Sequence, residues 1–164
     1  PVFVRNIFSR GSKDAKLIFS KEELEKLSKN KIISQEPLNG LEYTVDLLIL
    51  KDTFIASPRL RIDSTNVSIL SRVDLNKDII EFCRNICSKL DLYGPINIQL
   101  FKLKNGEFRL IEINPRLAGS SILSIQAGFD LLSLTIESML IDNVSKTAIK
   151  DGLTMQRYYC EKFF

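Results

Sequence analysis

The sequence of 164 residues contains no histidine and only three cysteines. Without histidine, the chain cannot build a Ser-His or Cys-His nucleophile system from its own residues. A zinc site usually needs four cysteine or histidine ligands in paired spacing, so this composition argues against one. No apolar run in the sequence is long enough to span a membrane. The chemistry left to the chain is that of oxygen ligands and cationic side chains.

The sequence also has no large net charge. The net charge is +3, from 23 basic and 20 acidic residues spread along the chain. Nucleic-acid binders usually concentrate basic residues on one face or in a tract, so we expect no nucleic-acid partner, and no membrane partner either. Hydrophobic residues make up 45% of the chain, which suits a core for one domain or two small lobes.

Cys83 and Cys87 lie four residues apart on a predicted helix from about 77 to 90. With neighbouring isoleucine and leucine residues they form one apolar stripe. Free cysteines are among the most often buried residues. The stripe therefore predicts core packing of reduced thiols and a cytoplasmic location.

The pattern of apolar residues predicts an α+β chain. In the first lobe, Ser20 and Glu23 form a capping-box sequence that opens a helix to about residue 29. In the second, Ser120 or Ser121 is predicted to cap a helix that ends at Gly128. Strands are predicted at 2–5, 16–19, 32–35, 43–50, 53–62, 67–73 and 155–160, and a last helix at 131–141.

Residues 94–116 predict a β-hairpin with oxygen-bearing side chains at its open end. Asn105-Gly106 is typical of a two-residue type I′ turn, because both residues tolerate positive φ. That turn would place residue 102 opposite 109, Gln99 opposite Glu112, and residue 97 opposite Asn114. Alternation then divides the side chains between two faces. One face would carry Gln99, Phe101, Leu103, Phe108, Leu110, Glu112 and Asn114, and the other Ile98, Leu100, Ile111 and Ile113.

A carboxylate between two amides beside apolar strands is costly to bury unless something binds it. Carboxylate and amide oxygens suit Mg²⁺, which is commonly held by one or two carboxylates plus substrate phosphates. Arg116, two residues beyond Asn114, offers a forked donor for a phosphate or carboxylate. On residue types alone, a hairpin whose polar ends are simply solvated remains an alternative.

The run from Gly94 to Gly128 resembles the ATP-grasp superfamily, and within it the carbamoyl-phosphate synthetase large chain and its relatives. The resemblance implies that Mg²⁺ (with Mn²⁺ as an alternative ion) binds Gln99, Glu112 and Asn114, with Glu112 bridging two ions. It also implies that Asn114 and Arg116 are catalytic, and that Arg116 meets the transferred phosphoryl group or the acyl phosphate. The matching motifs are Asn97-Ile98-Gln99, Glu112-Ile113-Asn114-Pro115-Arg116, Gly119-Ser120-Ser121 and Ala127-Gly128.

Upstream residues extend the resemblance to the nucleotide. Arg5 matches a basic residue that grips phosphates, and Gly11, Ser12 and Lys13 lie where the family has a glycine-rich phosphate loop. Asn6 replaces the usual proline, and Asp14 stands where a further glycine is expected. A carboxylate beside phosphates is electrostatically unfavourable, so the loop is either remodelled or grips phosphate less tightly.

The following segment resembles the family's hinge. The backbone of Glu36, Pro37 and Leu38 would meet the adenine edge, and Glu42 would bind the ribose hydroxyls. Further on, Arg59 and Arg61 alternate onto one strand face, and with Arg72 they match the substrate side of the family's cleft. The alternative interpretation is that these arginines lie on an exposed sheet face, where their charge is solvated.

The resemblance thus implies an ATP-grasp fold of two α+β lobes. Residues 1–39 would form the first lobe, with the phosphate loop and adenine hinge. Residues 40–164 would form the second, with the ribose, metal and substrate side and a largely antiparallel sheet. Because the family's fold starts upstream of a residue matching Pro1, we expect a fragment that lacks the N-terminal part and is inactive in isolation.

The implied reaction is that of an ATP- and Mg²⁺-dependent ligase. A carboxylate or bicarbonate attacks the γ-phosphate of ATP, and an amine captures the resulting acyl phosphate. Such phosphoryl transfers depend on cations and positioning rather than on a protein nucleophile. A non-catalytic nucleotide-binding module and a purely structural domain are the alternatives. The sequence leaves open the carboxylate and amine substrates, a homodimer, and a partner such as a glutaminase.

Overall fold

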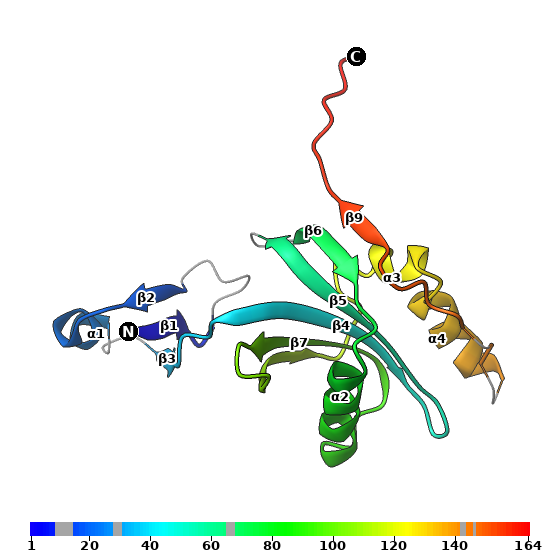
Figure 1. The fold of residues 1–164 in the computed structure, drawn as a ribbon, viewed down its shortest axis with the longest axis horizontal. Coiled ribbons are helices and arrows are strands. Elements are labelled where there is room, and N and C mark those ends of the chain that lie inside the picture. Colours follow the sequence, from blue (N-terminus) through cyan, green and yellow to red (C-terminus); the bar gives the residue numbers. More distant parts are fainter. Residues whose placement is uncertain (9–14, 28–30, 65–67, 142–143, 146) are drawn as a thin grey trace. The chain divides into compact units, whose positions relative to one another are not determined.

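The computed structural model describes residues 1–8, 15–27, 31–64, 68–141, 144–145 and 147–164. These residues divide into two compact units, Pro1–Asn39 and Gly40–Phe164, drawn as ribbons in Figure 1. None of the helices in these ranges combines the length and apolar content that a membrane crossing requires.

The first unit is a three-stranded antiparallel sheet in the order β2-β1-β3, with one short helix. Val4 and Ile18 are its buried apolar side chains. The Ser20 hydroxyl accepts a hydrogen bond from the Glu23 N–H at 3.2 Å, which confirms Ser20 as the helix cap. The elements are β1 (Val2–Asn6), β2 (Lys16–Ile18), α1 (Lys21–Leu27) and β3 (Ile32–Gln35).

The second unit is built on a six-stranded, fully antiparallel sheet in the order β8-β7-β4-β5-β6-β9 (Figure 1). The central strands are long and paired on both sides, so their backbone groups are satisfied within the sheet. The last strand is shorter than the predicted 155–160. The strands are β4 (Gly40–Ile49), β5 (Phe54–Ser64), β6 (Ser68–Val73), β7 (Gly94–Leu103), β8 (Phe108–Asn114) and β9 (Thr154–Gln156).

One face of this sheet packs against α2 (Lys77–Lys89). The Asn76 side chain caps the helix by accepting hydrogen bonds from the next N–H groups at 3.1 and 3.2 Å. Cys83 and Cys87 are buried with free thiols, as the stripe predicted. The sheet contributes the remaining fully buried core side chains, among them Val45, Leu47, Ile96, Ile98 and Leu100.

The other face is covered at one end by α3 (Ile122–Gln126) and α4 (Leu131–Leu140) (Figure 1). Leu48 of β4 packs there with Phe129, while Val73 packs with Leu123. Strand β4 is therefore buried on both faces, and its side chains at Thr44 and Asp46 face away from the α2 core. This end of the second face is apolar, and the rest of it is polar.

The predicted two-residue turn at Asn105-Gly106 is wrong. Leu103 donates to the Glu107 carbonyl at 2.8 Å, which closes a three-residue loop. In that loop Gly106 has φ +86°, whereas Asn105 is not among the residues with positive φ. The Asn105 side chain instead accepts from the Glu107 N–H at 3.0 Å. Three-residue hairpins commonly end in such a left-handed glycine.

This longer loop shifts the pairing near the turn by one residue, so Lys102 lies opposite Phe108 rather than Arg109. Phe108 consequently lies on the α2 face and packs on Phe82, with ring centroids 5.1 Å apart, contrary to its predicted face. A bulge between Gln99 and Leu100 then restores the predicted register. At the open end, the pairs are therefore those that the sequence predicted.

Candidate active site

The polar face of the second unit is made by neighbouring strands whose registers bring like-facing side chains together. Thr44 of β4 lies between Arg59 of β5 and Gln99 of β7, and Asp46 lies between its own partners on the same two strands. Partners directly opposite in antiparallel strands point to the same side. Gln99 is in turn opposite Glu112 of β8. One face thus gathers donors and acceptors from four strands.

This polar face contains a fully buried ion pair between Asp46 and Arg59, called here the buried base of the site. Arg59 Nη2 lies 2.9 Å from Asp46 Oδ2, and both side chains are inaccessible to solvent. Asp46 also accepts from Asn97 Nδ2 at 2.9 Å and from the Ser124 hydroxyl at 2.7 Å. A buried carboxylate with three donors is compensated on both oxygens, as burial of a charge requires.

Arg59 links this base to the segment that follows β8. Its Nη1 donates to the Ser120 carbonyl at 2.5 Å and to the Ser120 hydroxyl at 2.7 Å. Burial lowers the pKa of Arg59 from its ordinary value, while the charge and hydrogen bonding of Asp46 oppose that shift. The guanidinium therefore has a defined anionic partner on one side and a backbone segment on the other.

Three buried polar atoms near this pair, Ser57 Oγ, Ser71 Oγ and Arg59 Nε, have no hydrogen-bond partner within the part of the chain that the structure describes. Leaving a buried polar atom unsatisfied costs about 1–3 kcal/mol. Sites that depart from the most stable arrangement in this way are commonly functional.

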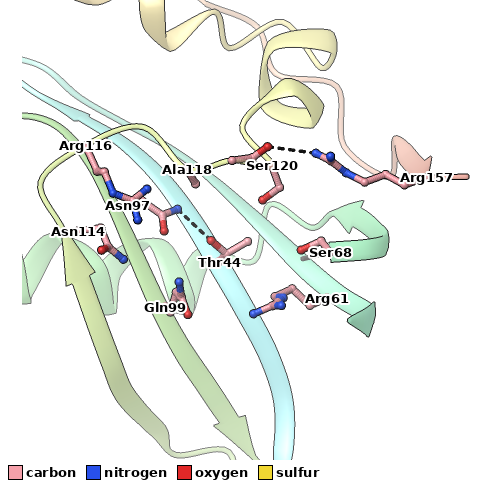
Figure 2. Close-up of a pocket in the computed structure, with 11 residues that line it drawn as sticks. Thr44, Arg61, Ser68, Asn97, Gln99, Asn114, Arg116, Ala118, Ser120 and Arg157 are labelled. Carbon is pink, nitrogen blue, oxygen red and sulfur yellow. Dashed lines mark hydrogen bonds between the residues drawn. The ribbon is translucent and has the colours of Figure 1, made fainter. Parts of the chain in front are cut away.

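Asn97 and Ser120, which this pair contacts, line a pocket of about 170 Å³ (Figure 2). Its wall combines guanidinium groups, hydroxyls and side-chain amides, and no acidic side chain lines it within the described ranges. Such a wall is suited to an anion. The lining residues are Thr44, Arg61, Ser68, Asn97, Gln99, Asn114, Arg116, Ala118, Gly119, Ser120 and Arg157.

Of the predicted metal ligands, Gln99 and Asn114 line the pocket, and Glu112 is exposed on β8 opposite Gln99. Since Glu112 and Asn114 alternate with Ile113, they share a face. The set offers one carboxylate and two amide oxygens, which are hard donors that fit Mg²⁺. No group of three or more His, Cys, Asp or Glu side chains gathers among the described residues. Water molecules and substrate phosphates commonly complete the shell of a Mg²⁺ ion that is held by few protein ligands.

The four arginines predicted for the substrate side and the reacting group lie in three different surroundings. Arg61 and Arg116 line the pocket, and Arg116 Nη1 donates to the Leu117 carbonyl at 2.9 Å. Arg59 lies in the buried base, so the alternative of a solvated arginine does not hold for it. Arg72 pairs with Leu60, which packs on the α2 core, and so belongs to the opposite face of the sheet from Arg61.

Glu42, the predicted ribose ligand, accepts a hydrogen bond from Arg61 within the second unit. The other predicted nucleotide residues belong to the first unit. Arg5 lies in β1, and Glu36, Pro37 and Leu38 lie between β3 and β4. Gly11, Ser12 and Lys13, with Asp14, lie outside the described residues.

Sequence reasoning missed two parts of the site. Asp46 is the one charged residue of the mostly apolar strand predicted at 43–50, a signal of a buried partner that could have been noticed. Arg157 follows β9 and donates to the Gly119 carbonyl at 3.1 Å (Figure 2). Nothing in the pattern of residues 142–164 indicated that contact, because it depends on how β9 joins β6.

Comparison with solved structures shows the fold. Over 94% of this chain and 44% of the other, the structure resembles the ADP complex of purK, N5-carboxyaminoimidazole ribonucleotide synthetase, with a TM-score of 0.75 and 16% identity. The corresponding enzyme from Thermotoga maritima gives 0.72 and 19% identity over 91% of this chain and 41% of that chain. The structure also resembles biotin carboxylase from Campylobacter jejuni, with a TM-score of 0.71 and 14% identity over 84% of this chain and 36% of that chain. These likenesses confirm the predicted ATP-grasp fold.

The sequence is also similar to carbamoyl phosphate synthase large chains, as the motifs around Glu112 and Asn114 predicted. The chain is 34% identical over 91 residues to the carbamoyl phosphate synthase large chain of Thermoanaerobacter sp. (strain X514), which covers 55% of this chain and 8% of that protein. It is 35% identical over 71 residues to the carbamoyl phosphate synthase large chain of Methanothrix thermoacetophila, a match that covers 41% of this chain and 6% of that protein. The chain therefore spans less than a tenth of the length of these relatives.

Residues 28–159 match the model of a family described as "ATP-grasp in the biosynthetic pathway with Ter operon". This match covers both the hairpin motifs and the segment that brings Arg157 to the pocket. The chain belongs to this ATP-grasp family.

Proposed function

We propose that the protein is an ATP- and Mg²⁺-dependent ligase that activates a carboxylate or bicarbonate as an acyl phosphate for attack by an amine. The observation that carries this proposal is the pocket of the second unit, where three arginines and no acidic residue of the described ranges lie beside the Gln99 and Asn114 amides. Membership of an ATP-grasp family and similarity to carbamoyl phosphate synthase, purK and biotin carboxylase support it.

In this proposal Gln99, Glu112 and Asn114 hold Mg²⁺ through their side-chain oxygens. When bound, the ion neutralises charge on the nucleotide phosphates. The restored register supports this set, because it pairs Gln99 with Glu112. The amides of Gln99 and Asn114 add no charge of their own. The pocket wall therefore stays attractive to an anionic substrate.

Arg61, Arg116 and Arg157 would hold the carboxylate substrate and the acyl phosphate made from it. All three line the pocket, and guanidinium groups match both carboxylate and phosphate geometry. Positioned positive charge stabilises the phosphoryl group as it is transferred. No nucleophilic side chain is needed, which agrees with a chain that lacks histidine.

The predicted nucleotide ligands remain part of this proposal. Arg5 with Gly11, Ser12 and Lys13 would contact the phosphates, and Glu42 the ribose. The backbone of Glu36, Pro37 and Leu38 would meet the adenine. An enzyme using ATP and small-molecule substrates, with free buried thiols, fits the cytoplasm.

The direct test uses the full-length protein with ATP, Mg²⁺ and a panel of carboxylates, and measures ADP release with and without amines. We expect ADP release that depends on a carboxylate. ATP binding without carboxylate-stimulated turnover across the panel would instead favour a non-catalytic nucleotide-binding module. The unfavourable Asp14 in the phosphate loop motivates that second candidate.

Substitution tests the metal assignment. Glu112→Gln removes the single carboxylate of the ligand set, so turnover should fall by about 10²–10³-fold. Folding should be nearly unchanged because Glu112 is exposed. Glu107→Gln, on the same hairpin and paired with Arg109 at 2.6 Å, is the matched control. Near-normal turnover of Glu112→Gln would contradict the assignment.

A further inference from the structure

The pocket wall rests on the buried Asp46–Arg59 pair. Neither residue lines the pocket, but each contacts one that does. Arg59 Nη1 is bonded to both oxygens of Ser120, and Asp46 Oδ1 is bonded to Asn97 Nδ2. The two charged side chains are in this way directly behind the wall, on the side away from any ligand.

Each contact fixes a degree of freedom of the site. The bonds to Ser120 hold the segment after β8, which carries Arg116 at its start and lies against Arg157 through the Gly119 carbonyl. Because the Arg59 guanidinium donates to both the carbonyl and the hydroxyl of Ser120, it restrains the orientation of Ser120 as well as its distance from Arg59.

The second contact orients a side chain. Asn97 Nδ2 donates to the Asp46 carboxylate, to the Val45 carbonyl at 3.2 Å and to Thr44 Oγ1 at 2.9 Å. Carbonyl and carboxylate oxygens only accept, so these partners determine which end of the amide is the nitrogen. Figure 2 shows the Asn97–Thr44 bond at the floor of the pocket. Asn97 lies opposite the predicted ligand Asn114.

We propose that Asp46 and Arg59 are positioning residues that set the geometry of the anion pocket through Ser120 and Asn97. This inference rests on the proposed function for the identity of the pocket's ligand. A buried ion pair is weak evidence of stabilisation, since well-packed apolar residues often replace such a pair without loss. Asp46 of β4 and Arg59 of β5 each form a hydrogen bond with a residue of the pocket wall. Its role is therefore to hold the wall in one arrangement.

The first variant is Arg59→Lys in the 164-residue chain, which keeps the charge but cannot bond Asp46 and both Ser120 oxygens together. We expect amides at residues 118–121 to exchange hydrogen roughly tenfold faster or more, while amides in the centre of β7 stay unchanged. Binding of inorganic phosphate, followed by amide chemical shifts, should weaken roughly tenfold, the usual effect of losing an outer positioning contact. Arg109→Lys, a partly exposed arginine with one acidic partner, should change neither.

The second variant separates positioning from stability. Asp46→Leu with Arg59→Met replaces the pair by apolar side chains, which should preserve the thermal midpoint. We expect phosphate binding to stay weakened and residues 118–121 to stay fast-exchanging. A stable double variant with normal phosphate binding and normal exchange would overturn the inference. If it fails to fold, Arg59→Lys alone decides.

The two proposals fail in different ways. Absence of phosphate binding by the unsubstituted chain would count against the proposed anion pocket, while hydrogen exchange at 118–121 would still decide the positioning role. Unchanged exchange at 118–121 in Arg59→Lys would overturn the positioning role, even with phosphate bound normally to the parent chain.

Discussion

Arg61 of β5 donates a hydrogen bond to the Glu42 carboxylate of β4 while also lining the anion pocket. Both side chains are mostly buried, at 12% and 26% exposure. A charge-assisted bond in such surroundings is stronger than a neutral one. The carboxylate proposed to bind the ribose is thus tied to the arginine proposed to meet the substrate, so a change at Glu42 should reach both ligands.

Replacing Glu42 with Gln should raise the KM for ATP roughly tenfold, because hydrogen bonds to charged groups contribute about 1.5–3 kcal/mol. The measurement is steady-state ADP release by the full-length protein. Glu81→Gln, which alters an exposed helix-surface pair with Arg84, should leave that KM unchanged. A Glu42→Gln enzyme with the parent's KM for ATP would remove Glu42 from the nucleotide site.

The cap of α2 predicts a stability difference between two substitutions at one position. Asn76→Ala removes an acceptor for two backbone N–H groups and should cost about 1 kcal/mol of unfolding free energy. Asn76→Gly should cost only a few tenths, since glycine is tolerated at the cap position. Urea unfolding of the chain measures both. Equal losses for the two variants would show that the cap bonds are not the source of the effect.

Alanine should destabilise the protein at Gly128 but not at Gly119. At Gly128, φ is +103° and an added Cβ would lie 2.5 Å from the Ala148 carbonyl oxygen, whereas a Cβ at Gly119 would meet nothing within 4 Å. Gly128→Ala should therefore lower the unfolding free energy by more than about 1 kcal/mol. Gly119→Ala should be near neutral. Thermal unfolding of both variants checks this, and a neutral Gly128→Ala would contradict the close packing at this turn.

The buried thiols predict how stability depends on alkaline pH. Burial, with a smaller effect of Cys87, raises the pKa of Cys83 from 9.0 to about 12. The unfolded thiol then loses its proton near pH 9, while the folded one keeps it. The unfolded state therefore binds fewer protons between these values, and stability should be constant below about pH 9 and fall above it.

That fall should approach about 1.4 kcal/mol per pH unit for each such thiol. Cys83→Ala should make the decline between about pH 9 and pH 11 shallower in urea unfolding. Burial and Asp74 also raise the pKa of Tyr43, so part of the decline should persist. Cys160→Ala, at an exposed thiol, should leave it unchanged. An identical pH profile for Cys83→Ala would mean that the thiol does not couple to folding.

Local features of this protein were readable from the sequence. The Ser20 cap, the apolar stripe with Cys83 and Cys87, and the antiparallel hairpin all depend on residues within a few positions of one another. The resemblance of the motifs around Glu112 and Asn114 added the family, which the matches confirm. The hairpin turn was mispredicted because Asn105 and Gly106 suit both two- and three-residue loops, and the strand bulge that compensates for the longer loop has no simple sequence signal.

Alternation along β8 alone determined that Glu112 and Asn114 would share a face, because side chains in a strand point to opposite sides with a period of two. Gln99 joins them through the pairing of β7 with β8, which the bulge restores. Only the tertiary structure decided which charges are buried and what they hold. Arg59 meets Ser120 across 61 residues of sequence, and Asp46 meets Ser124 across 78. The free energy of a buried charge depends on partners brought in by distant elements, and no short-range pattern in the sequence specifies them.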